Sequence, residues 1–376
     1  MTNPSDICVK PVGELSEAER ASWSVLREQD PLLANPFLSC DFATAVAEAG
    51  PAVEVALVQQ EDRILGILPF QRTGQVGKPV GSIVSELQGI VARPGAEFDF
   101  RSLLTAANLR CWDYDGALAH QSILQASSIA TREASFIDLE VYRTDQELAT
   151  GGERSSWLKD TARKERKLAR EVGSPRFVLA DDPEEPLAAL HRWKSLQYAR
   201  TGTFNVLSID WVWQLVQQLS TCSTDDLSGV CSTLYAGDRL LAVHFGILSR
   251  GVLASWFPAY DYDLGGYSPG LILLKHLIAQ GGEAGVRRID LGQGNERYKT
   301  SAATGSYPLC EGSVGRSPTE RLARRAWVGV RDWAQSSPSA QRPLVAFRAA
   351  RNWVKRHRQK QVSSSTTCDL PSGEGR

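Results

Sequence analysis

The chain has 376 residues, of which 42% are hydrophobic and 23% charged, with a formal net charge of −1 at pH 7. This length allows two domains with ordinary cores, and the composition excludes disordered and fibrous classes for most of the chain. The seven cysteines and five histidines show no metal-ligand spacing, so we expect reduced cysteines and no metal. No apolar run reaches the roughly 18 residues of a membrane span, and the N-terminus lacks a signal-peptide pattern. We therefore expect a cytoplasmic protein.

The first half reads as a mixture of helices and strands. Ser16 and Glu19 form the pattern of a capping box at the start of a helix. Two apolar runs that flank a polar turn predict a hairpin. The expected elements are helices near 17–29, 42–49 and 98–109, hairpin strands at 53–60 and 64–72, and a strand at 135–139. Residues 1–145 are therefore expected to form one α/β domain.

A polar, glycine-containing segment at 144–156 predicts a boundary, so a second domain is expected over 150–315. It begins with a strongly basic helix at 157–172, which is either a solvated face or a site for phosphates or another anionic partner. The remaining expected elements are a strand at 176–180, helices at 186–200 and 208–220, and antiparallel strands at 229–236, 239–249 and 252–258.

Residues 253–300 are the stretch around which this second domain is organised. An apolar strand runs into a polar loop, and Ser268-Pro269-Gly270 then opens a helix that ends near Gly281. Pro is tolerated at the first helical position and Ser is a good N-cap. Because Gly270 has no side chain, another group can come close to the helix mouth, where free N–H groups and the helix dipole favour an anion.

A buried strand over 286–291 follows and carries Asp290 near its end. It runs into 292–299, so ionisable and aromatic groups gather where the strands finish, which is the usual place for a ligand in an α/β sheet. Gly292-Gln293-Gly294 is an incomplete nucleotide-binding fingerprint and is weak evidence for such a site.

The segment 316–376 differs from the rest in charge. It holds 13 Lys/Arg and 4 Asp/Glu, a net charge of +9, whereas the preceding residues hold 29 and 39. A basic helix at 342–360 would suit the surface of an anionic membrane or another partner, and a solvated or disordered tail is the alternative. Beyond Val362 we expect disorder.

The order of several short motifs resembles that of a known family. The runs 256–261 (WFPAYD), 267–270 (YSPG) and 290–299 (DLGQG followed by YK) look like the GNAT-type acyltransferases of cellulose biosynthesis, often labelled CelD/BcsL. That family is similar to the FemAB peptidoglycan aminoacyl transferases. Further matching segments lie at 35–39, 67–71 and 86–89, and the likeness covers about 20–315.

The resemblance implies an α/β fold of two GNAT-like domains in tandem, each a mixed, mostly antiparallel sheet flanked by helices. It also implies a splayed central strand that leads into a helix whose N-terminus holds the pyrophosphate of acetyl-CoA or another acyl-CoA. The cofactor-binding residues would be Ser268, Pro269, Gly270 and Leu271. The usual Gln/Arg- and glycine-rich pyrophosphate loop is absent, which leaves an aminoacyl-tRNA donor open.

Direct acyl transfer needs a base, an oxyanion stabiliser and a proton for the leaving thiolate. His244, in an apolar strand, is either a neutral base or a satisfied core histidine. Asp261 is a base, a substrate ligand or a turn stabiliser. Asp290 needs a partner because it is in an apolar strand, and Arg297 or Lys299 would supply one. Tyr298 is the candidate proton donor, with core packing as the alternative.

Substrate-binding candidates come from both halves. Tyr260, Glu296 and Lys299 lie in the central stretch, and Lys299 would contact an anionic acceptor or donor. The first half lacks a comparable anion site, so we expect a degenerate GNAT domain that shapes the acceptor site. The residues expected to contact the acceptor from this half are Glu86, Gln88 and Trp112.

The sequence thus predicts an acyltransferase that modifies an amine or hydroxyl of a sugar or amino-sugar intermediate, small or lipid-linked, in exopolysaccharide or cellulose synthesis. The polysaccharide role comes from the family resemblance alone. One alternative is FemAB-like aminoacyl transfer, the only reading that involves RNA; DNA binding is not expected. Another is a non-catalytic accessory protein of a polysaccharide synthase. The basic tail would allow peripheral contact with the inner membrane face.

Overall fold

The structure is a computed structural model that describes residues 6–61, 63–96, 99–147, 153–294, 296–316, 324–326 and 328–329. Two compact units are present, over 1–321 and 322–376. In the second unit the described residues are helical. The predicted basic helix at 342–360 lies outside the described residues, as does the expected disorder beyond Val362. All contacts below belong to the first unit.

The first half of this unit alternates helices and strands, as the sequence predicts. Its main elements are β1 (Asp6–Pro11), α1 (Glu17–Arg27), α2 (Cys40–Ala49), β2 (Glu54–Gln60), β3 (Arg63–Thr73), β4 (Val76–Lys78), β5 (Val91–Ala92), α3 (Phe100–Ala106), β6 (Cys111–Leu118), α4 (Ser122–Ala126), β7 (Ser128–Asp138) and α5 (Leu139–Glu147). The predicted capping box is present at α1, where the Glu19 N–H donates to Ser16 Oγ and the Ser16 N–H donates to Glu19 Oε2.

The second half supplies the central stretch and its surroundings. Its main elements are α6 (Glu153–Glu171), β8 (Pro175–Val178), α7 (Glu184–Thr201), α8 (Asp210–Ser220), β9 (Ser228–Ala236), β10 (Arg239–Ser249), β11 (Val252–Tyr260), the 3₁₀ helix η5 (Tyr262–Tyr267), α9 (Pro269–Gln280), β12 (Arg288–Gln293), α10 (Arg297–Ala302) and β13 (Gly305–Gly315).

All strands join one 13-stranded mixed sheet with the order β1-β2-β3-β4-β6-β13-β7-β12-β11-β10-β9-β8, and β5 pairs with β3. Most neighbours are antiparallel, and β11 pairs with β12 in parallel. The last strand, β13, lies between β6 and β7 of the first half. The two halves are therefore joined by backbone hydrogen bonds. The boundary predicted near 145–150 stays a prediction.

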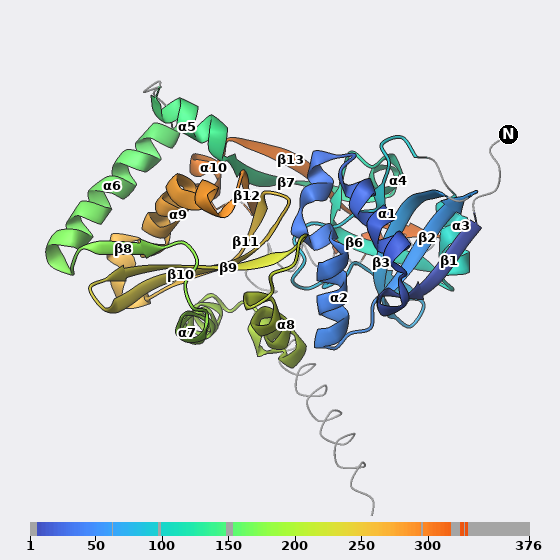
Figure 1. Ribbon diagram of the computed structural model, residues 1–376, viewed down its shortest axis with the longest axis horizontal. Coiled ribbons are helices and arrows are strands. Elements are labelled where there is room, and N and C mark those ends of the chain that lie inside the picture. Colours follow the sequence, from blue (N-terminus) through green and yellow to red (C-terminus); the bar gives the residue numbers. More distant parts are fainter. Residues whose placement is uncertain are drawn as a thin grey trace, which may run out of the picture. The chain divides into compact units, whose positions relative to one another are not determined.

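The helices of the second half cover both faces of its strands. In Figure 1, α7 and α8 lie on one side of β9, β10 and β11, and α6, α9 and α10 lie on the other. Leu190 and Leu215 pack on Phe245 on the first face, while Leu277 packs on Leu253 on the second. Each face of the sheet therefore has its own apolar core.

The two central parallel strands separate soon after they meet. β11 and β12 pair only between Val252–Ala254 and Arg288–Asp290, although β11 continues to Tyr260. A register shift in the β10–β11 pairing lies at the same level, so β11 carries a bulge there. The splayed central strand that the resemblance implies is present.

Candidate functional site

The mouth of α9 differs in detail from the expected N-cap. Ser268 has a left-handed backbone, with φ of 54°, and its side chain makes no capping hydrogen bond to the helix. Instead its Oγ accepts a hydrogen bond from Lys164 Nζ of α6 at 3.1 Å. The expectation that the Ser268 side chain caps the helix is wrong. The structure instead places a cation at the positive end of the helix, where an anion is favoured.

Aromatic rings border this mouth. A Cβ on Gly270 would lie 3.5 Å from the ring of Tyr260, an ordinary contact, and Tyr260 is 40% exposed. Lys167 lies over the ring of Tyr267, with 5.2 Å from Nζ to the ring centroid. Pro269 has no N–H, and the Leu271 N–H donates to the Ser268 carbonyl. Of the four predicted cofactor residues, Gly270 therefore offers the first-turn N–H that has no acceptor within the helix.

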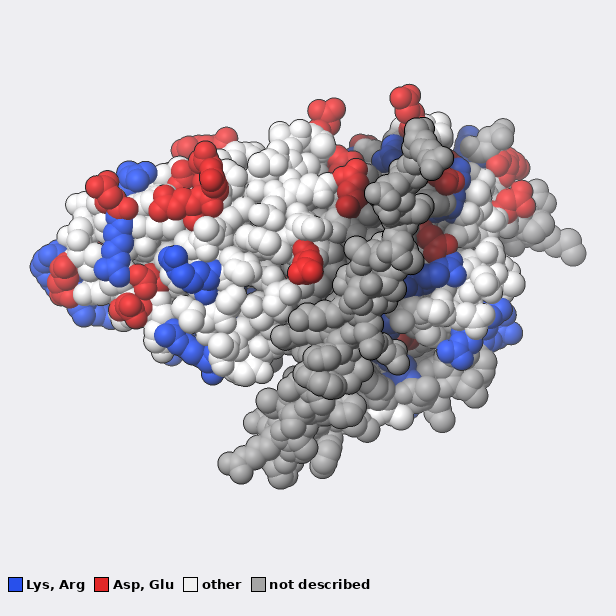
Figure 2. All heavy atoms as spheres, turned by 90° about the horizontal axis from the view of Figure 1, so that it is seen from below, with Lys and Arg blue, Asp and Glu red and all other residues white. Residues whose placement is uncertain are grey.

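The basic helix α6 is held in place by acidic partners. Glu165 binds both Lys275 and His276 of α9, which fixes α6 beside the mouth. On the exposed side, Asp160 pairs with Arg163, and Glu171 pairs with Arg170. Figure 2 shows basic and acidic side chains interspersed over the described part of the face that carries α7 and α8. Neither surface resembles the continuous basic track that RNA favours.

His244 lies in the interior on β10. It is 2% exposed, and its Nε2 is 3.0 Å from Ser255 Oγ on β11. Burial lowers the pKa of His244 to about 4, so the ring is neutral at pH 7. The predicted neutral imidazole is present, and Ser255 is the residue that its Nε2 contacts. Its role as base stays a prediction.

Two predicted acids have structural partners. Asp261 accepts from Arg239 at 2.7 Å and from the Asp263 N–H, which agrees with the turn-stabilising alternative. Asp290 is buried, and the ion pair expected with Arg297 or Lys299 is replaced by neutral donors. Its carboxylate accepts hydrogen bonds from Asn35, from Tyr307 and from the Gly292 N–H. Burial raises the pKa of Asp290, and these donors oppose that rise.

Four charged side chains gather at the carboxyl end of β12. We call Glu86, Lys194, Glu296 and Lys299 the polar cluster. Glu86 comes from the loop after β4, Lys194 from α7, Glu296 from the β12–α10 connection and Lys299 from α10. Lys299 donates to the Gln293 carbonyl, and Lys299 Nζ lies 3.5 Å from Glu296. Lys194 and Lys299 are 9% and 7% exposed, respectively.

Glycines allow the cluster to form. A Cβ on Gly292, whose φ is 68°, would lie 1.7 Å from Glu86 Oε2. A Cβ on Gly116 of β6 would lie 2.6 Å from Gln293 Nε2, which donates to the Glu86 carbonyl at 3.3 Å. The Glu86 carboxyl therefore rests directly on the backbone at the end of β12.

The polar cluster shifts the pKa values of its own members. Burial raises the pKa of Glu86 to about 8, and Lys299 and Lys194 oppose the rise while Asp290 and Glu296 add to it. Burial also lowers the pKa of Lys194 to about 8, which Glu86 counteracts. Perturbed ionisable groups of this kind are typical of catalytic sites. A carboxyl with a pKa near 8 is suited to proton transfer near neutral pH.

Gln88 and Trp112, the other two substrate-binding candidates of the first half, lie outside the polar cluster. Gln88 accepts from the N–H groups of Asp115 and Gly116 and donates to the Asp115 carboxylate at 2.6 Å. It holds the Glu86 loop on β6. Trp112 is 1% exposed and stacks on Tyr114 in the core beneath α3. The structure therefore places Trp112 in the core, because the indole faces the apolar side of β6; its contact with an acceptor stays a prediction.

Tyr298 follows the cluster on α10. It is half-buried beside Leu253 and Leu277. Burial raises the pKa of its hydroxyl, with Glu296 and Glu86 adding to the rise. The hydroxyl is therefore protonated at neutral pH, as a proton donor requires; its catalytic role stays a prediction.

Sequence reasoning missed Lys194 and Ser255. Lys194 lies within an ordinary amphipathic helix, and nothing in the sequence distinguishes it from an exposed lysine. Ser255 stands in an apolar strand, where a single polar residue was the available signal. Both become recognisable only through their neighbours in space.

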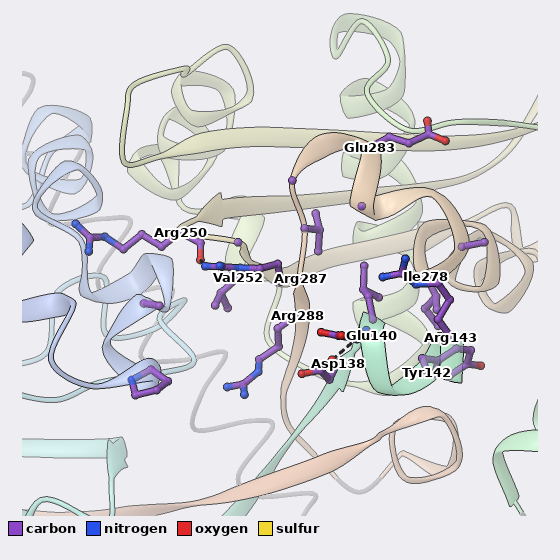
Figure 3. A pocket seen from close by; sticks show the side chains of 18 of the residues that line it. Asp138, Glu140, Tyr142, Arg143, Arg250, Val252, Ile278, Glu283, Arg287 and Arg288 are labelled. Atoms are coloured by element: carbon purple, nitrogen blue, oxygen red, sulfur yellow. Dashed lines mark hydrogen bonds between the residues drawn. The ribbon is translucent and has the colours of Figure 1, made fainter. Parts of the chain in front are cut away.

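A groove lies at the opposite ends of the central strands. It has a volume of about 1350 Å³ and is lined by charged residues of both halves. Figure 3 shows Arg250, Arg287 and Arg288 on one side of it and Asp138 and Glu140 on another. Arg250 is bound to Asp226 and Glu28. The groove begins at Val252 and Arg288, the first residues of β11 and β12, so it is remote from the polar cluster at their far ends.

Within the described residues, no group of three or more His, Cys, Asp or Glu side chains is arranged to hold a metal ion. Among the helices described, none is long and apolar enough to cross a membrane.

Comparison with known proteins gives a family match for the second half of the chain. Residues 156–300 match the family model described as an acetyltransferase (GNAT) domain. FemX has a similar structure, with a TM-score of 0.53 and 10% identity over 80% of this chain and 98% of that chain. No curated protein sequence matches this chain.

Two further solved structures are similar in part. A tandem GNAT protein from the clavulanic acid pathway has a TM-score of 0.45 and 12% identity, covering 83% of this chain and 99% of that one. A protein of unknown function from Bacteroides thetaiotaomicron has a TM-score of 0.49 and 11% identity, covering 81% and 100%. The family match and the FemX likeness confirm the predicted fold class. Residues 156–300 therefore match a GNAT-type acetyltransferase domain, and this match supports an acyltransferase.

Proposed function

We propose that the enzyme transfers an acetyl or other acyl group from acyl-CoA to an amine or hydroxyl of a sugar or amino-sugar intermediate of exopolysaccharide synthesis. The observation that carries the catalytic part is Glu86, whose pKa of about 8 arises in a polar cluster beside the end of β12. The saccharide acceptor is supported by the resemblance to the CelD/BcsL acyltransferases.

The mouth of α9 suits the phosphates of the donor. The Gly270 N–H and Lys164 Nζ supply hydrogen bonds and positive charge there, and Asp160 and the Ser268 hydroxyl hold Lys164 in position. The thioester would then lie where β11 and β12 separate, between this mouth and the polar cluster. This arrangement brings donor and acceptor together from opposite directions.

Proton transfer in this proposal uses two groups. Glu86 removes the proton from the acceptor amine or hydroxyl as its nitrogen or oxygen bonds to the thioester carbonyl carbon. Tyr298 gives a proton to the sulfur as the carbon–sulfur bond breaks, and releases the acylated acceptor and free CoA. Lys194 and Lys299 favour the ionised form of Glu86 and therefore increase the fraction of Glu86 that can act as a base at neutral pH.

The first experiment is calorimetric titration with acetyl-CoA and free CoA. Gly270→Trp should abolish micromolar binding because the indole would fill the mouth beside Tyr260. Gly282→Trp is the matched control at the other end of α9, where a Cβ would meet nothing within 4 Å. Undetectable binding to folded wild-type protein, or equal binding by both variants, would refute the donor site.

Aminoacyl transfer is the second candidate, and the fold likeness to FemX favours it. It predicts turnover that ribonuclease destroys and that acetyl-CoA cannot support. The paired charges of α6 argue against it. Adding ribonuclease to an assay of acceptor modification separates the two donors.

Peripheral attachment of the enzyme to the inner membrane face through residues 316–376 is a further part of the proposal. Its support is the net charge of +9 in that segment. Sedimentation with anionic vesicles at low and high salt tests it. Equal sedimentation with neutral vesicles would contradict it.

A further inference from the structure

The hydroxyl of Ser255 lies at the point where the central strands part. Ala254 is the last residue of β11 that pairs with β12, and Ser255 follows it. The β10–β11 register passes from Ile247–Ala254 to Phe245–Phe257, which leaves Ser255 within the bulge. Bulges re-aim side chains and are common beside active sites. The Ser255 side chain turns to His244.

The unpaired nitrogen of His244 decides how this pair is protonated. Among the described residues, His244 Nδ1 is buried and has no hydrogen-bond partner outside His244 itself, whereas Nε2 contacts Ser255 Oγ at 3.0 Å. In a neutral ring one nitrogen carries hydrogen and the other accepts. An orphaned buried N–H is rarer than an under-satisfied acceptor. If the hydrogen is on Nε2, no buried N–H is left without an acceptor. The Nε2–H of His244 therefore donates to Ser255 Oγ.

This direction leaves the Ser255 O–H free to donate to another group. A serine hydroxyl has one hydrogen to donate, and here its oxygen already accepts from His244. The same strand leads towards the donor mouth, because Pro258 pairs with His244 and Tyr260 borders Gly270. The five residue steps from Ser255 to Tyr260 span roughly 16 Å of strand, a distance that the extended pantetheine arm of CoA can bridge.

We infer that Ser255 donates a hydrogen bond to the carbonyl oxygen of the donor thioester as that oxygen becomes negative, and that His244 is the positioning residue that fixes the serine. This inference rests on the proposed acyl transfer from acyl-CoA. Ser255 remains unacylated: its O–H bond persists, and the acyl carbon bonds only to the acceptor. Preorganised donors of this kind act chiefly on the transition state.

The first test separates chemistry from binding. Ser255→Ala should lower kcat on the order of 10²–10³-fold, with the Kd for acetyl-CoA within about twofold of wild type. Ser232→Ala is the matched control, because that hydroxyl, on β9 at the far side of β10, binds the Leu179 carbonyl, and kcat should be unchanged. A kcat for Ser255→Ala within threefold of wild type would overturn the inference.

The second test needs no turnover. Nitrogen-15 NMR of the ligand-free protein should show His244 as the neutral Nε2–H form. The Nδ1–H form would overturn the inference even if Ser255→Ala were slow. If wild type failed to bind or use acyl-CoA, the proposed function would fail and the oxyanion role with it, whatever the tautomer. Thermal melting of Ser255→Ala and Ser232→Ala excludes misfolding as the cause of a lost rate.

Discussion

The donor mouth and the polar cluster are assembled in different ways. The mouth consists of α6, η5 and α9, all within the GNAT domain, and its key contact joins Lys164 to Ser268. The polar cluster combines Glu86 of the first half with Lys194 and Lys299 of the second. In the proposed function, donor recognition therefore uses one half of the chain, whereas the proposed base becomes available only when both halves are folded together.

The comparison also explains the role of the first half. Gln88 fastens the Glu86 loop to β6, and β13 bridges β6 and β7. The first half contributes the carboxyl with the pKa of about 8. Substitutions in the polar cluster should therefore change kcat, whereas substitutions at the mouth of α9 should change the Kd for the donor.

The largest expected effect comes from Glu86→Gln. Loss of the base should lower kcat on the order of 10²–10⁴-fold, with the Kd for CoA unchanged because the mouth is intact. Steady-state kinetics and calorimetry check both parts. Glu283→Gln, an exposed carboxyl at the end of α9, should behave as wild type. Equal loss in both variants would show that Glu86 has no special role.

The stability of wild type should also depend on Glu86. Its pKa rises from 4.5 unfolded to about 8 folded, so the folded state binds more protons between these values. Its contribution to stability is present below about pH 4.5 and is lost as pH rises through about 8. Chemical denaturation of Glu86→Gln should show a weaker fall over this window. The same fall in both proteins would exclude Glu86 as its cause.

Gly292→Ala should be next in effect. The new methyl group would overlap Glu86 Oε2, and the left-handed φ of 68° is itself unfavourable for alanine. We expect a destabilisation of about 1–3 kcal/mol and a fall in kcat on the order of 10²-fold. Gly282→Ala, with nothing within 4 Å of the added Cβ and no left-handed φ, should lose neither. Denaturation curves and kinetics on both variants provide the comparison.

Lys194→Met should change the pH profile more than the maximal rate. The activity of wild type should increase as pH rises through about 8, because Glu86 acts in its ionised form. Since Lys194 lowers the pKa of Glu86, its removal should move this limb to higher pH, with kcat at pH 7 falling roughly tenfold per unit of movement. If activity rose at the same pH in the variant as in wild type, Lys194 would have no influence on the pKa of the base.

The smallest effect is expected for Lys164→Ala. The removed charge is partly exposed, so the Kd for CoA should rise only about threefold to tenfold, and less at high salt. The kcat should remain near wild type because Lys164 lies at the mouth of α9. Calorimetry at two ionic strengths tests this. A large fall in kcat with unchanged Kd would mean that the mouth and the cluster are not separate regions.

The local features of the fold could be predicted from the amino-acid sequence alone. The capping box at α1, the Pro269-Gly270 helix start and the strand–helix–strand pattern of 253–291 depend on neighbouring residues, so each was readable from order and spacing. The splay and the GNAT-type fold followed from motifs in the same contiguous stretch.

Tertiary structure decided the partners of ionisable groups. Asp290 was expected to pair with a lysine or arginine but binds Asn35 and Tyr307, which are distant in sequence and brought close by the shared sheet. The pKa of a side chain depends on its burial and on its neighbours in space, and neither can be read from the local sequence. For that reason Glu86 became the proposed base only in the folded protein, while Lys194 and Ser255 passed unnoticed in the sequence.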